Sequence, residues 1–203
     1  MNTAKSIATA SLRRCGVLAL TVSAIGIYSA PHTAAAQTKE LSDKSIETLI
    51  NYAWAITPPK FTTPEGKTIE VDKSKRDQVV VPLDAARDIV KVGRLSASAQ
   101  ICGLAEQQAA NYQTMMAREI AKKKWSEQQL LFISQLHLFT VMMMTGGVKV
   151  VDRGEKEGDK EIIIDNKKLG KPSDSACSDA EKGKVQEQLA SYRDAGTAPA
   201  KKQ

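Results

Sequence analysis

One histidine and a group of methionines are the residues of this sequence whose types and spacing could do chemistry. His137 is the only histidine after residue 40, and it stands seven residues before Met144, the last of three consecutive methionines. Residues seven apart share one face of a helix, and Met115 and Met116 precede them on a segment that could face them in an antiparallel hairpin. Because thioether and imidazole groups suit Cu(I), this pattern is compatible with copper binding.

The same residues also suit a role in packing. Methionine fills irregular gaps in hydrophobic cores, and a single histidine on a buried helix is usually a hydrogen-bonded core residue. Both interpretations stay open at the level of sequence. The candidate ligand-binding residues are therefore Tyr112, Met115, Met116, His137 and Met144, with the metal unknown and no cofactor expected.

The sequence has no recognisable catalytic constellation. A Ser-His-Asp hydrolase needs a histidine base, and His137 is flanked by Leu136 and Leu138, which indicates burial. Glu106 and Glu119 stand 13 residues apart on one predicted helix, about 20 Å along a straight helix, which is too far for the paired carboxylates of a glycosidase. These observations favour a protein that is not an enzyme.

The first 36 residues have the pattern of a secretory signal peptide. Lys5, Arg13 and Arg14 precede an apolar run over residues 16–30, and Ala34-Ala35-Ala36 precedes the predicted cut. An uncleaved anchor is the alternative, but the run is shorter than the roughly 20 residues that span a bilayer. We therefore expect a periplasmic or secreted protein with no integral membrane segment after cleavage.

Two cysteines remain after that cleavage. Cys102 and Cys177 form an even pair in an exported chain, which is most simply a disulfide. Neither belongs to a Cys-x-x-Cys pair, so redox catalysis is not expected. In the chain-entropy model, closing a loop of this length stabilises the fold by roughly 4 to 5 kcal/mol.

Two predicted helices carry the candidate residues. The first follows Pro82 and keeps an apolar face as far as about Lys122, with a kink or break expected over residues 93–98, where a glycine and two serines weaken the helix. The second begins at Ser126 with the spacing of a capping box and ends at Gly146-Gly147. It is apolar on all sides, which is typical of a buried helix. We expect the two helices to form an antiparallel hairpin.

Two further segments have the β-branched runs of short hairpins. Thr68–Val71 and Val79–Val81 flank a charged turn, where an extended loop is the alternative. Val148–Val151 and Glu161–Ile164 bracket a second charged stretch. Each pair of runs is expected to lie antiparallel if it forms a hairpin.

The chain after cleavage suits one domain. A single helical domain is expected over residues 37–195, followed by a disordered tail over 196–203. Further helices should begin after Ser42 and at Ser178 or Asp179 and cover the hairpin. The predicted fold class is mainly α: a small helical bundle built on an antiparallel helix hairpin, with one or two short β-hairpins or extended loops and one disulfide.

The charge balance limits the kinds of partner. Without the signal peptide, 26 basic residues stand against 23 acidic ones, which argues against a dedicated nucleic-acid binder. The lysines at 122–124, beside Trp125, could touch an anionic surface or simply form a solvated helix end.

The predicted function is that of an exported, non-enzymatic binding or assembly protein. Surplus apolar surface on the 126–145 helix suits a homodimer interface or a groove for an envelope protein partner. The alternative function is capture of a small ligand or copper in the interior of the helix hairpin.

Overall fold

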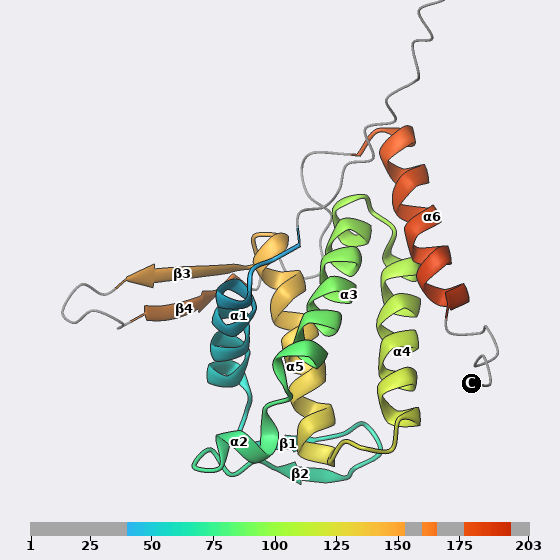
Figure 1. Cartoon of the computed structure of the whole chain (residues 1–203). Coiled ribbons are helices and arrows are strands. Elements are labelled where there is room, and N and C mark those ends of the chain that lie inside the picture. Colours follow the sequence, from blue (N-terminus) through green and yellow to red (C-terminus); the bar gives the residue numbers. More distant parts are fainter. Residues whose placement is uncertain (1–39, 153–159, 166–176, 196–203) are drawn as a thin grey trace, which may run out of the picture. The chain divides into compact units, whose positions relative to one another are not determined.

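The computed structural model describes residues 40–152, 160–165 and 177–195 (Figure 1). The predicted signal peptide and the predicted tail lie outside these ranges. The described residues form six helices, which are α1 (Asp43–Ile56), α2 (Arg76–Val79), α3 (Leu83–Ile101), α4 (Ala105–Ala121), α5 (Glu127–Met144) and α6 (Asp179–Ala195). They also form two antiparallel hairpins, β1 (Lys60–Thr62) with β2 (Thr68–Glu70) and β3 (Val148–Asp152) with β4 (Lys160–Ile164). The predicted fold class is confirmed.

Local hydrogen bonds start the helices where the sequence predicts. Ser42 caps α1 by accepting a bond from a backbone amide of its first turn. At α5, Ser126 Oγ accepts from the Gln129 amide at 3.2 Å, and the Gln129 side chain accepts from the Ser126 amide at 3.0 Å. Ser178 and Glu181 make the same reciprocal pair at α6, at 3.3 and 2.8 Å. Each cap satisfies amides that have no partner within the helix.

The long predicted helix is two helices. The first of them, α3, runs through residues 93–98 and ends at Ile101, so the break predicted over those residues is wrong. The chain then reverses at Gly103, whose φ of +72° is one that glycine adopts without strain. As a result α4 returns antiparallel to α3, and α5 runs antiparallel to α4 (Figure 1). The predicted hairpin therefore pairs α5 with α4, while α3 makes the most extensive packing contact with α5.

Gly93 allows this close packing of α3 on α5. A Cβ at this position would lie 2.8 Å from Thr140 Cβ and 3.3 Å from the His137 carbonyl oxygen. Contacts of real Cβ atoms are essentially never as short as the first of these distances. The glycine therefore serves contact between helices rather than a bend, which helix propensity alone does not reveal.

Substituting Gly93 by alanine is expected to destabilise the protein by about 1–2 kcal/mol, because overpacking outweighs the gain in helix propensity. Gly183 on α6 is the matched control, since a Cβ there meets no atom within 4 Å. Gly183→Ala should stabilise the protein by up to about 1 kcal/mol. Urea unfolding of the two variants should give shifts of opposite sign, and equal shifts would contradict the packing role of Gly93.

The first hairpin differs from the predicted one. β2 pairs with β1, with Phe61 opposite Ile69, rather than with Val79–Val81. Val79 and Val81 are buried in the core instead, with Val79 at the end of the single turn of α2. The apolar surface of these residues is thus used for packing rather than for strand pairing. The second predicted hairpin is confirmed, with Val150 opposite Ile162.

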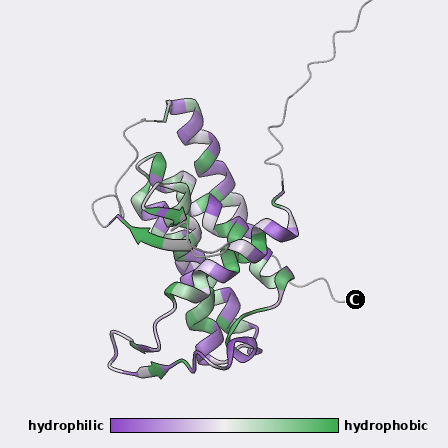
Figure 2. Ribbon diagram, turned by 90° about the vertical axis from the view of Figure 1, so that its left-hand side faces the viewer, coloured by the Kyte–Doolittle hydropathy of each residue, from purple (hydrophilic) through white to green (hydrophobic). Residues whose placement is uncertain are grey.

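The core surrounds α5, whose Phe132, Leu136 and Phe139 are fully buried. α1 and α3 cover two of its sides. The prediction that α5 is buried all round holds for most of the helix, but Leu138 and Met144 are 45% and 43% exposed. Hydrophilic residues recur along α6 (Figure 2), in which only Leu189 is buried. Within the described ranges, no helix combines the length and apolar character that crossing a membrane requires.

Candidate functional site

A groove of about 500 Å³ lies between α4 and α5, where Leu138 is exposed. The surface of its walls is mostly apolar, although six of the eleven lining residues carry a neutral polar group. The lining residues are Gln100, Ala105, Gln108, Ala109, Tyr112, Ser134, His137, Leu138, Val141, Met142 and Thr145. Because Ala105 and Ala109 are small, the side chains of α4 leave the space beside α5 open.

His137 forms part of the groove wall and is 4% exposed. Its Nε2 lies 2.9 Å from Ser96 Oγ, and Asn111 Nδ2 donates to the same oxygen at 2.8 Å. Asn111, which is fully buried, also donates to the Val92 carbonyl oxygen at 3.3 Å. This polar network joins α5, α3 and α4 behind the groove, and it fixes their spacing.

His137 Nε2 has a neutral hydrogen-bond partner. Either Nε2 or Ser96 Oγ can be the donor of the bond between them, because a hydroxyl oxygen can accept bonds from both Asn111 and His137. Burial lowers the pKa of His137 to about 4. The imidazole is therefore neutral near pH 7.

Tyr112 forms another part of the wall. Its ring lies against the His137 ring, with 5.1 Å between centroids, and its hydroxyl is hydrogen-bonded to Ser134 Oγ at 2.8 Å. Elsewhere in the lining, Gln108 Nε2 donates to Gln100 Oε1 at 3.1 Å. These bonds hold polar side chains of the wall in place.

The other predicted site residues lie elsewhere. Met115 is 1% exposed, packs in the core and lines a separate cavity of about 350 Å³ on the side of α6. Met116 packs against the core, and Met144 is exposed at the end of α5. Of the five predicted residues, only Tyr112 and His137 line the groove together. Among the described residues, no three His, Cys, Asp or Glu side chains converge as metal ligands.

Sequence reasoning missed the residues that shape the groove. Ala105 and Ala109 stand four apart, as do Gln108 and Tyr112, so all four lie toward one side of α4. Small residues on a face toward a neighbouring helix are the signal that could have indicated unfilled space. Their meaning depends on the distance between the helices, which sequence does not supply.

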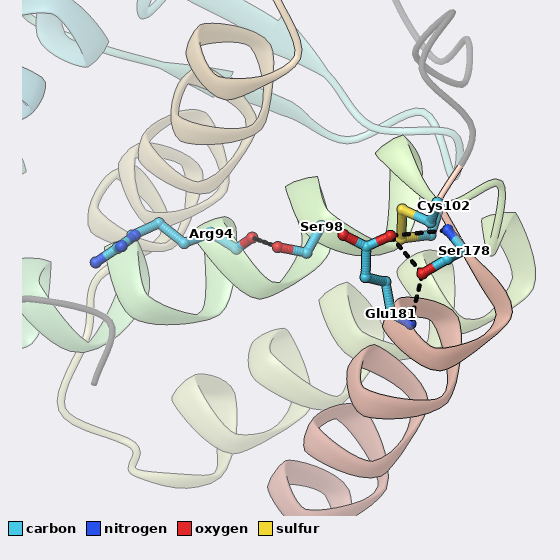
Figure 3. The surroundings of a disulfide bond; sticks show 6 residues. Arg94, Ser98, Cys102, Ser178 and Glu181 are labelled. Atoms are coloured by element: carbon cyan, nitrogen blue, oxygen red, sulfur yellow. Dashed lines mark hydrogen bonds between the residues drawn. A yellow bond between two sulfur atoms is a disulfide. The ribbon is translucent and has the colours of Figure 1, made fainter. Parts of the chain in front are cut away.

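The predicted disulfide is present and joins the start of α6 to the end of α3. Cys102 and Cys177 have their Cα atoms 5.0 Å apart (Figure 3), beside the Ser178–Glu181 cap. At the far end of α6, Arg118 donates to the carbonyl oxygen of Tyr192 at 2.6 Å, and its guanidinium lies over the Tyr192 ring. α6 is thus attached to the α3–α4 hairpin at both of its ends.

The lysine run between α4 and α5 has structural contacts. Glu119 is 7% exposed and accepts bonds from Lys122 Nζ and Trp125 Nε1, both at 2.7 Å. Lys124 Nζ lies 4.3 Å from the centroid of the Trp125 ring. Two of the three lysines therefore help to hold the connection between α4 and α5.

Comparison of the chain with protein-family models, with curated proteins and with solved structures finds no match. The fold and the groove define its structural class: a disulfide-linked helical bundle with a neutral groove between two antiparallel helices. Function is therefore argued from the groove itself.

Proposed function

We propose that this protein is an exported, non-enzymatic binding protein that holds a small, mainly apolar molecule between α4 and α5. The groove of about 500 Å³ is the observation that carries the proposal. Small-molecule sites typically measure about 300–1,000 Å³ and combine apolar walls with a few placed polar groups. Export rests on the signal-peptide pattern of residues 1–36.

The polar network supports a preformed site. His137, Ser96 and Asn111 join the three helices that contribute to the groove. A groove whose walls are already held apart does not need to be ordered when a ligand arrives, so less of the binding free energy is lost.

Binding fits the chemistry of the wall better than catalysis. A general acid or base needs a pKa near the working pH, whereas burial lowers the pKa of His137 to about 4. None of the described residues that line the groove is a carboxylate or a lysine, so the imidazole has no such group beside it in the wall.

A docking role for α5 is the second candidate. Leu138 is 45% exposed and also lines the groove, so apolar surface continues from the groove onto the outside of the helix. An envelope protein or a second copy of the chain could place an apolar helix there. Sedimentation of wild type and of Leu138→Asp would test this role. Wild type should form an assembly, and Leu138→Asp should not. A wild-type monomer would count against self-association.

Filling the groove is the direct test of ligand binding. Ala109→Phe places a ring in the groove, whereas Ala117→Phe is the matched control at an exposed position of α4 outside the groove lining. Native mass spectrometry of protein isolated from its own periplasm should show an added organic mass on wild type and on the control. Ala109→Phe should lose it. An added mass that persists on Ala109→Phe would place the ligand elsewhere. A wild-type protein without any added mass would count against the proposal.

A further inference from the structure

We infer that the α4–α5 groove selects an electrically neutral ligand and discriminates against carboxylates, sulfonates and amines of similar size and shape. This inference rests on the proposed function and deepens it by naming the chemical class of the ligand. It depends on how charge is distributed between two neighbouring cavities of the fold.

The groove lining is uncharged. Its polar atoms are amides, hydroxyls and one imidazole, and none of the described residues in the wall carries a formal charge at neutral pH. A bound ion would exchange its hydration for aliphatic side chains and neutral dipoles without meeting a counter-ion. Such a transfer is costly for a charged group and favourable for an apolar one.

The other cavity, on the side of α6, has charged side chains in its wall. They are those of Asp88, Lys91, Arg118, Glu119 and Lys122. Glu119 and Lys122 are paired there, and Arg118 binds the carbonyl oxygens at the end of α6. The neutrality of the groove is thus a property of one side of the α4 helix rather than of the whole bundle.

His137 keeps the wall neutral. The hydrogen-bond partner of its Nε2 is the neutral hydroxyl of Ser96, at 2.9 Å, rather than a carboxylate that would stabilise a positive imidazole. Burial also lowers the pKa of His137 to about 4. The groove therefore offers an incoming molecule hydrogen bonds and apolar contact, but no ionic attraction.

Two fluorescent probes of matched shape test the inference on the full chain after signal cleavage. N-phenyl-1-naphthylamine is neutral, whereas 1-anilinonaphthalene-8-sulfonate carries a sulfonate on the same aromatic rings. Fluorescence titration should give at least about tenfold tighter binding of the neutral probe, equivalent to about 1.4 kcal/mol. Ala109→Phe should abolish binding of that probe, and Ala117→Phe should not.

A charge placed at the groove should change the preference. Leu138 is suited to this because it lines the groove and is largely exposed, so a polar side chain is tolerated. Leu138→Lys should tighten binding of the sulfonate probe at least about tenfold, a change of about 1.4 kcal/mol, relative to Leu138→Gln, its uncharged control.

The outcomes separate the inference from the proposed function. If wild type binds both probes equally and Ala109→Phe abolishes binding of both, the inferred neutrality is overturned. The groove would still be a ligand-binding site. If Leu138→Lys binds the sulfonate probe no more tightly than Leu138→Gln does, the inferred neutrality of the groove is also overturned. Binding of both probes unaffected by Ala109→Phe would overturn the groove as a ligand site, and the inference would fail with it.

Discussion

Replacement of Cys102 and Cys177 by alanine is expected to lower the free energy of unfolding by about 4 kcal/mol. The disulfide spans 75 residue positions, and restricting the unfolded chain over such a loop stabilises the native state by roughly 4 to 5 kcal/mol in the chain-entropy model. The loss should appear as a lower urea midpoint, and reduction of wild type should reproduce it.

The position of the disulfide also predicts where structure is lost first. α6 buries only Leu189 completely, and Arg118 donates bonds to two carbonyl oxygens at its far end. Without the covalent link, amide hydrogen exchange should accelerate in α6 before it does in α3 and α5. Uniform acceleration over all three helices would contradict this order. A change in unfolding free energy below about 1 kcal/mol would contradict the role of the disulfide in stability.

Acidification is expected to destabilise the protein through His137. Burial lowers the pKa of this group from 6.5 to about 4 in the folded protein. Because the unfolded chain binds the proton more tightly, stability falls as the pH falls from about 6.5 to about 4. The shift corresponds to a loss of about 3 kcal/mol across that window.

His137→Gln is the control that isolates this effect. Glutamine can accept from Ser96 without titrating, and other acid-sensitive groups, such as Glu40 and Asp72, remain the same in both proteins. The difference in unfolding free energy between wild type and variant should be constant above pH 7 and move against wild type by about 3 kcal/mol near pH 4. A difference in unfolding free energy that stays constant over the whole pH range would contradict the role of His137 in acid destabilisation.

Features that depend on neighbouring residues could be predicted from the sequence. Ser42, Ser126 and Ser178 start helices because their side chains bond to amides three residues away. The pairing of Cys102 with Cys177 followed from the number of cysteines that remain after the predicted signal peptide. The β3–β4 hairpin followed from two β-branched runs around a charged stretch.

The location of the break in the long helix could not be predicted in this way. Glycines at 93 and 103 offer the same freedom to the backbone, but only Gly103 takes a positive φ. Gly93 lies within α3, where Thr140 of α5 packs against it. The difference between them lies in a neighbour more than forty positions away in the chain.

The sequence by itself determined that this protein is mainly helical, where most of its helices begin, and which two cysteines join. These properties follow from hydrogen bonds over a few residues and from composition. Only the tertiary structure decided that Met115 belongs to the core, that burial keeps His137 neutral, and that Ala109 faces an open groove. The physical reason is that burial and cavity shape depend on the distances between packed helices, which no local pattern contains.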